Sequence, residues 1–156
     1  MIARHSLPAQ ALAEAAIVIP ILLLVAFTGI GMGRLIQARM GLSAATREAA
    51  RATALAPMPN YAKTDQESRR DHAVEDGEQL GRGVARDNGL NGAEIRITVD
   101  AFQPGGWVRA DGTYEVKTSD IPFMRELFAG ATRGAPIKLT VTHIERIDPY
   151  RSWGAP

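Results

Sequence analysis

The side chains that could support catalysis are scattered along this sequence. Its three histidines are His5, His72 and His143, and the His-Ile-Glu stretch at 143–145 has no second metal-ligand pair to go with it. One such pair is no metal site, because zinc and similar ions take three or four protein ligands at defined spacings. The glycine-rich stretch 77–83 lacks the Lys-Ser or Lys-Thr of a phosphate-binding loop, and no serine lies in a GxSxG motif. We therefore predict no enzyme activity, no cofactor and no metal.

Glu14 is the ionisable residue with the most informative position. It directly precedes nineteen uncharged, mostly apolar residues, 15–33, which end at Arg34. As a helix this run is about 28 Å long, close to the hydrocarbon core of a bilayer at about 30 Å. We predict that 15–33 spans a membrane. At its edge, Glu14 either pairs with a cation of a neighbouring subunit or simply marks the end of the span.

The apolar run could also be a buried core helix or a cleavable secretory signal peptide. Core helices seldom run this long without a polar residue. The apolar region of a signal peptide has about 7 to 15 residues, and 29–34 contains no small-x-small cleavage site followed by a turn. We favour a permanent membrane anchor.

The remainder of the 156-residue chain is long enough for one small domain. The chain has no cysteine, so it forms neither disulfides nor thiolate metal sites. Its formal net charge is +1, which argues against nucleic acid as a partner, because nucleic-acid binders present a strongly basic surface.

The helix that contains the apolar run is predicted to continue to about Leu55, before Pro57 and Pro59 stop it. Small and apolar residues recur beyond the span at spacings of three and four. This seam consists of Leu35, Ala38, Leu42, Ala45, Ala49, Ala52 and Ala56. Inside the span, Gly29 and Gly33 form a GxxxG pair, which is typical of close helix packing in membranes. We expect part of the seam to meet the chain's own second helix, and the membrane part to face lipid or another subunit.

That second helix is predicted in the polar stretch 63–88, where a thin stripe from Ala73 to Val84 has helical spacing. Asn88 and Gly89 are predicted to end it. Each interior glycine costs about 1 kcal/mol relative to alanine. Packing, more than helix propensity, must therefore stabilise this helix.

Alternation with a period of two predicts three half-buried strands, around 95–101, 114–118 and 137–143. Segments 103–106 and 111–112 carry turn signals, and 107–110 is either a short extra strand or part of a long loop. A further short helix is predicted between Ser119 and Gly130. The fold class is α+β: a long N-terminal transmembrane helix continues into a small domain, where a second helix packs on an antiparallel sheet of three to four strands.

The sequence around the apolar run resembles a known family. PAQALAE at 8–14, AAIVIP at 15–20 and the leucine run after them resemble the N-terminus of TadE-like minor pseudopilins of tight-adherence (Flp) pili. Met-Gly-Arg at 32–34 and Arg-Glu-Ala-Ala-Arg at 47–51 are similar to further motifs of this family.

This resemblance implies a prepilin-type leader, 1–9, cut by a prepilin peptidase between Ala9 and Gln10. Glu14 would be the glutamate five residues after the cut, and the freed amine of Gln10 in a neighbouring subunit would be its cation. The chain has Ala9 where the family usually has glycine, and Ala15 where an aromatic residue is common. Pro20, Gly29 and Gly33 would take part in helix packing within the membrane.

The orientation of the chain involves a conflict. The arginines at 34, 39, 47 and 51 outnumber the positive charges before the span, so the positive-inside rule would keep the C-terminal part in the cytoplasm. The resemblance implies the reverse. Long domains translocate largely regardless of charge, so we expect a single-pass protein of the bacterial inner membrane with a periplasmic or extracellular domain. It would either stay in the membrane or become incorporated into the pilus.

The predicted parts are therefore the leader 1–9, the N-terminal helix 10–56 with its span at 15–33, and an extracytoplasmic α/β domain, 57–156. The function we favour is that of a minor pseudopilin, a structural and assembly component of the pilus system. Its expected partners are a prepilin peptidase, other pseudopilins and the major pilin, inner-membrane platform proteins and membrane lipid. The alternative is a bitopic, membrane-tethered binding module unrelated to pili.

Overall fold

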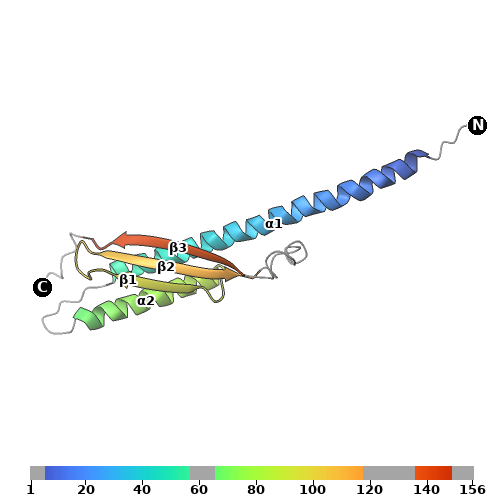
Figure 1. The fold of residues 1–156 in the computed structure, drawn as a ribbon. Coiled ribbons are helices and arrows are strands. Elements are labelled where there is room, and N and C mark those ends of the chain that lie inside the picture. The colour runs from blue at the N-terminus through green and yellow to red at the C-terminus, as the bar shows by residue number, and fades with distance from the viewer. Residues whose placement is uncertain (1–5, 57–65, 118–135, 149–156) are drawn as a thin grey trace, which may run out of the picture.

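The structure, a computed structural model, describes residues 6–56, 66–117 and 136–148, with the backbone alone for 6–9 and Gln66. In chain order the elements are α1 (Ser6–Leu55), α2 (Gln66–Asp87), β1 (Glu94–Val99), β2 (Trp107–Val116) and β3 (Ile137–Arg146). The strands form one antiparallel sheet in the order β1-β2-β3 (Figure 1). The predicted α+β fold class is confirmed, and the described residues form three strands of the sheet.

Helix α1 has two parts with different surroundings. Its 50 residues correspond to a length of about 75 Å. The N-terminal half projects away from the rest of the molecule, whereas the C-terminal half runs along the sheet (Figure 1). The helix starts at Ser6, ahead of the predicted start at Gln10. Pro8 is compatible with this earlier start, since it falls in the first turn, where the missing backbone N–H breaks no hydrogen bond.

Two helices cover one face of the sheet. The C-terminal half of α1 lies against β2 and β3, and α2 lies beside it against β1 (Figure 1). The helix-facing residues of β1 and β2 are buried, among them Ile95, Ile97, Val108 and Ala110. This arrangement confirms the prediction of a sheet with one face covered by helix.

The contact between α1 and α2 depends on small residues. A Cβ atom at Gly77 would clash with the Thr53 hydroxyl and lie 3.0 Å from the Ala49 carbonyl oxygen. At Gly81 it would lie 2.8 Å from the Ala49 Cβ atom. The two glycines let the helix backbones approach closely. The seam's outer part therefore contacts the chain's own second helix, as expected, and packing stabilises α2 despite its glycines.

The predicted turn at Asp111-Gly112 is wrong, because both residues lie inside the ten-residue strand β2. The segment 107–110, for which the sequence allows either a strand or a loop, is the first part of this strand. Gly112 faces the helices, and a Cβ atom there would clash with the Thr46 methyl group and lie 3.1 Å from Leu42. Glycine is required here by the close approach of α1 to the sheet and not by a change of chain direction.

The other predicted ends of helices and strands agree with the structure to within a few residues. Gly89, at a φ of 78°, ends α2 as predicted, and the tight turn at 103–106 connects β1 to β2. Strand β3 extends to Arg146, three residues past the predicted end. The helix predicted between Ser119 and Gly130 lies outside the described residues, as do His5, Pro57 and Pro59.

Candidate functional site

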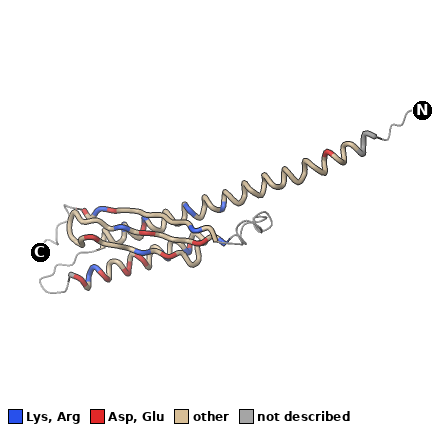
Figure 2. Tube along the Cα trace, in the orientation of Figure 1, with Lys and Arg blue, Asp and Glu red and all other residues tan. Residues whose placement is uncertain are grey.

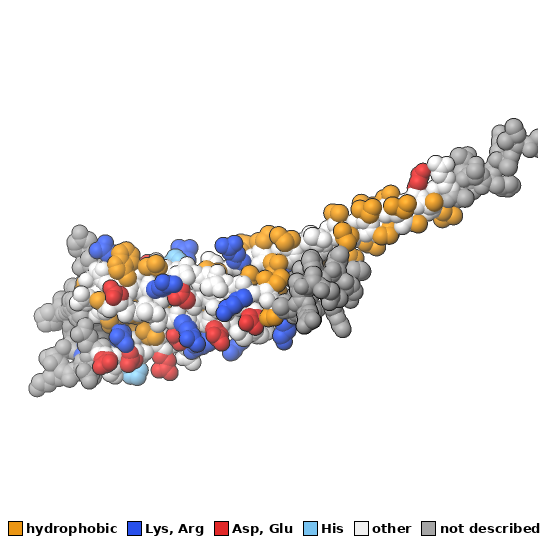
Figure 3. Space-filling model, in the orientation of Figure 1, with side chains coloured by type: hydrophobic (Ala, Val, Ile, Leu, Met, Phe, Trp, Pro, Cys, Tyr) orange, Lys and Arg blue, Asp and Glu red, His pale blue; other side chains and the backbone are white. Residues whose placement is uncertain are grey.

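The projecting half of α1 exposes an almost continuous apolar surface. Its large apolar side chains are exposed on all sides, and they include Leu12, Ile17, Val18, Ile19, Ile21, Leu22, Leu23, Leu24, Val25, Ile30 and Met32. Figure 3 shows hydrophobic side chains along the visible face of the projecting helix, and Figure 2 shows no charge on the helix between an acidic position near its start and the basic positions beside the domain. A soluble protein does not leave such a surface in water.

Within the described residues, α1 is the one helix that is long and apolar enough to cross a membrane. Only 6% of its most apolar 18-residue stretch is buried, whereas the core helix of a soluble protein is mostly buried. The helix is consistent with a single-pass membrane anchor.

Gln10 and Glu14 lie one turn apart at the exposed start of this helix. The Gln10 Nε2 group donates a hydrogen bond to Glu14 Oε1 at 3.2 Å. Both side chains are exposed, so the Glu14 carboxylate keeps acceptor capacity for another donor. Ala9 belongs to the same helix, but its side chain lies outside the described part.

Pro20, Gly29 and Gly33 all lie on the projecting half of α1. The helix continues without interruption through Pro20. A Cβ atom at Gly29 or Gly33 would meet nothing within 4 Å, so neither glycine is needed for packing among the described residues. Both leave bare backbone on the helix surface, where a second helix could approach.

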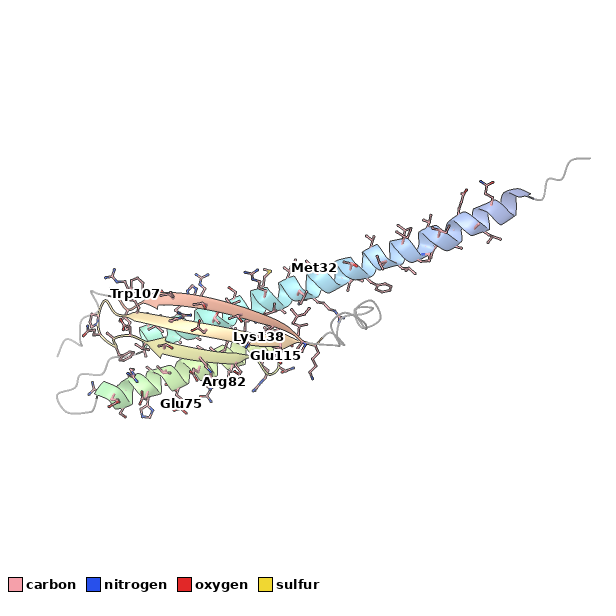
Figure 4. All side chains as sticks on the ribbon, viewed as in Figure 1. Met32, Glu75, Arg82, Trp107, Glu115 and Lys138 are labelled. Atoms are coloured by element: carbon pink, nitrogen blue, oxygen red, sulfur yellow. The ribbon has the colours of Figure 1, made fainter. Side chains whose placement is uncertain are left out.

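A cavity of about 280 Å³ opens at the end of the domain nearest the projecting helix. Three parts of the chain line it: Arg34, Gln37 and Ala38 from α1, 88–90 after α2, and Tyr114 with Val116 from β2. A second hollow of about 440 Å³ adjoins it through Tyr114 and includes Lys117, Lys138, Glu94 and Glu115 in its lining. Figure 4 shows Glu115 and Lys138 at this end of the sheet and Trp107 at the opposite end.

The outer face of the sheet carries a polar cluster at its centre. The Arg109 Nε group donates to Asp111 Oδ2 at 2.9 Å, and the Thr142 hydroxyl on β3 donates to Asp111 Oδ1 at 2.5 Å. The hydrogen bond from Arg109, followed by that from Thr142, lowers the pKa of Asp111 below its ordinary value. The cluster links β2 to β3 on the solvent side of the sheet.

The histidines within the described residues do not converge on a site. His72 is exposed on α2. The His143 Nε2 atom lies 3.4 Å from Glu145 Oε2, and both side chains are half-buried on the helix-facing side of β3. No group of three or more His, Cys, Asp or Glu side chains that could hold a metal ion occurs in the part of the chain described by the structure.

Together, these features define a small α+β domain carried on a single apolar helix. The family model described as TadE-like protein matches residues 9–51, which confirms the resemblance predicted from the sequence. The matched stretch lies within α1 and includes Gln10, Glu14, Pro20, Gly29 and Gly33. Neither the curated proteins nor the solved structures yielded a match to this chain.

The matched family is associated with tight-adherence pili and is structural rather than catalytic. The match lies within α1, so Asn88 and Tyr114 of the cavity and Lys117 and Lys138 of the second hollow lie outside the matched segment. The sequence carried no signal for this cavity, because its lining residues are up to 82 positions apart and only the fold brings them together.

Proposed function

We propose that this protein is a minor pseudopilin of a tight-adherence (Flp) pilus system. The observation that carries the proposal is the division of α1 into an exposed apolar half and a half packed in the domain, together with the TadE-like match over the same helix. Such a helix can hold the domain at the membrane and, in an assembly, pack against the helices of other subunits. Its partners would be other pseudopilins, the major pilin and inner-membrane platform proteins.

The proposal includes cleavage by a prepilin peptidase between Ala9 and Gln10. The cut would create a new amine on Gln10, four residues before the Glu14 carboxylate. A charge-assisted hydrogen bond between this amine and Glu14 of a neighbouring subunit would fix the axial position of the two helices. The exposure of both side chains supports this role, since no other described residue competes for the outer side of the carboxylate.

Co-expression with the matching prepilin peptidase tests the cleavage. Intact mass and N-terminal sequencing should give a mature chain that begins at Gln10, and Ala9→Arg should block the cut while leaving membrane insertion intact. An uncut chain, or a cut after the apolar run, would contradict the prepilin interpretation.

Glu14→Leu tests the assembly role. Insertion should become easier because a carboxylate is removed from the membrane edge, whereas crosslinking from cysteines placed at Gly29 or Gly33 to other pseudopilins should weaken. If Glu14 merely marks the end of the span, the crosslinking yield will not change. Glu14→Gln is the matched control, because it keeps the size of the side chain and one acceptor oxygen while removing the charge.

A membrane-tethered binding module is the second candidate, favoured by a patch at the membrane-distal end of the sheet. Trp107 is 50% exposed and Ile144 is 54% exposed on the outer face. The Arg146 guanidinium lies 5.5 Å from the centre of the Trp107 ring, and such residues are common at protein interfaces. Genes for a secretion ATPase, platform proteins and a prepilin peptidase beside this one would favour the pseudopilin.

A further inference from the structure

We propose that the 280 Å³ cavity beside Arg34 binds the phosphate headgroup of an anionic phospholipid. The proposal requires α1 to span the membrane, but it does not depend on a role in pili. Its ligand class is a phosphodiester that carries a net negative charge, as in phosphatidylglycerol.

Helix α1 sets the depth of the cavity relative to the bilayer. Arg34 is the first charged residue after the apolar run, and Gln37 and Ala38 follow it in the cavity wall. At about 1.5 Å per residue, these positions lie within about 8 Å of the end of the run. The headgroup layer extends roughly 5 to 8 Å beyond the hydrocarbon on each side. The cavity therefore opens at the depth of the lipid phosphates.

The lining of the cavity suits a lipid headgroup. Arg34 supplies a guanidinium group, which binds phosphate oxygens in a bidentate manner. Gln37 and Tyr114 add neutral donors, and tyrosine is enriched at membrane interfaces. Leu90 and Val116 supply apolar surface in the same wall, against which the glycerol and the first acyl carbons would lie.

At the end of α2, where a helix is ordinarily negative, hydrogen bonds to the terminal carbonyl groups reduce the repulsion of an anion. The last carbonyl groups of α2 already have donors within the chain. Leu90 N–H donates to the Ala85 carbonyl and Gly89 N–H to the Arg86 carbonyl, both at 2.9 Å. The Asn88 amide donates to the Val84 carbonyl at 2.8 Å.

We expect the adjoining hollow to attract anionic lipids at long range and not to form a second phosphate site. Lys117 and Lys138 line it, and within the described part of the chain neither lysine forms an ion pair. Glu94 and Glu115 line the same hollow and offset the two lysines. The cavity at Arg34 has no carboxylate among the described residues of its wall, so the phosphate is expected there.

Lipid selectivity of the full chain in detergent micelles tests the proposal. The protein is incubated with equimolar phosphatidylglycerol and phosphatidylcholine, and the bound lipids are counted by native mass spectrometry. The wild type should prefer phosphatidylglycerol. Arg34→Gln should reduce that preference about fivefold, the change expected for one cation close to a membrane surface.

Arg47→Gln is the matched control. Arg47 is an exposed arginine on the same helix, about 20 Å farther from the span, and its loss should leave the preference unchanged. Tyr114→Phe, which removes only a hydroxyl group, should weaken the preference less than Arg34→Gln. The proposal would be overturned if the ratio of bound phosphatidylglycerol to phosphatidylcholine were equal in the wild type and Arg34→Gln. It would also be overturned if Arg34→Gln and Arg47→Gln lost the same amount of this preference.

Two further measurements distinguish a lipid site from a general anion site and from a failure of the membrane anchor. Displacement of phosphatidylglycerol by about 10 mM inorganic phosphate would show a general anion site and overturn the lipid assignment. Carbonate extraction of cell membranes reports on the anchor itself: a chain released into the supernatant would refute the membrane span, and with it the proposed function. A chain retained in the pellet without lipid preference would refute the lipid site alone.

Discussion

At the scale of single residues, glycines determine how closely the layers of the domain pack. Gly77 on α2 and Gly112 on β2 each sit where a Cβ atom would clash with a threonine of α1. Thr46 and Thr53 are themselves fully buried, and their hydroxyl groups donate to α1 carbonyls one turn earlier, at 3.0 and 3.1 Å. The interface therefore has little free volume for any added methyl group.

Two glycine-to-alanine substitutions in α2 should distinguish the effect of packing on stability from the effect of helix propensity. Gly77→Ala should destabilise the domain by about 1 to 3 kcal/mol, because the methyl group meets Thr53 and the Ala49 carbonyl. Gly83→Ala should stabilise it by about 0.5 to 1 kcal/mol, since its Cβ meets nothing within 4 Å and alanine is the better helix former. Thermal unfolding of the full chain in detergent, followed by tryptophan fluorescence, measures both. Shifts of the same sign in the two variants would contradict this packing.

Asp111 should make stability depend on pH in the acidic range. Its pKa is lowered in the folded protein by the hydrogen bonds from Arg109 and Thr142, so the folded state favours the ionised carboxylate. This contribution is fully present above the ordinary aspartate pKa of about 4 and is lost as the pH falls through the lowered value. In melting curves between about pH 2 and 7, the advantage of wild type over Asp111→Asn should shrink below about pH 4. An advantage that is constant with pH would exclude this linkage.

At the scale of elements, α1 belongs to two environments. Its exposed apolar half ends near Arg34, and the face packed on the core begins at the partly buried Leu35 and continues through Ala38, Leu42, Ala45 and Ala49. The boundary of the folded unit therefore lies inside the helix. Residues 34–55 contribute to the core of the domain although they precede the predicted domain start at residue 57.

Truncation within α1 should reveal this boundary. A fragment that begins at Arg34 retains the whole buried face and should fold as a soluble monomer with mixed helix and sheet by circular dichroism. A fragment that begins at Leu42 loses the buried Ala38 and also Gly41, where an added Cβ atom would lie 3.3 Å from the Leu90 side chain, and it should unfold at a lower temperature. Equal melting temperatures would show that the turns before Leu42 do not stabilise the domain.

At the scale of the whole molecule, charge is concentrated on the domain and apolar surface on the projecting helix (Figure 3). The two ends of the domain also differ. The end near the span carries the Arg34 cavity with Lys117 and Lys138 nearby, whereas the far end carries the exposed Trp107. The proposed membrane anchor at one end and the exposed Trp107 at the other suit the proposed role of a protein that connects a bilayer to an assembly.

Reporter fusions test the orientation of this arrangement. Alkaline phosphatase fused after Pro156 should be active, because the domain is expected on the periplasmic side, and a cytoplasmic reporter at the same place should be inactive. Deletion of 17–27 should abolish the phosphatase signal and release the domain into the soluble fraction, since it removes most of the span. The reverse pattern would mean that the arginines after the span hold the domain in the cytoplasm.

The sequence by itself determined the elements whose evidence is local. An apolar run of membrane length, helical spacing in α2 and alternation in the strands each depend on neighbouring residues, and all three predicted the correct elements. The TadE-like resemblance was also available from contiguous motifs within α1, and the family match covers the same residues.

Only the tertiary structure decided the features that depend on contacts between distant residues. Asp111-Gly112 has the composition of a turn, yet Gly112 lies in a continuous strand because α1 passes too close for a side chain. The cavity walls come from three elements whose proximity no local pattern encodes. Local sequence sets backbone preference, but close packing between layers overrides it where a single methyl group would not fit.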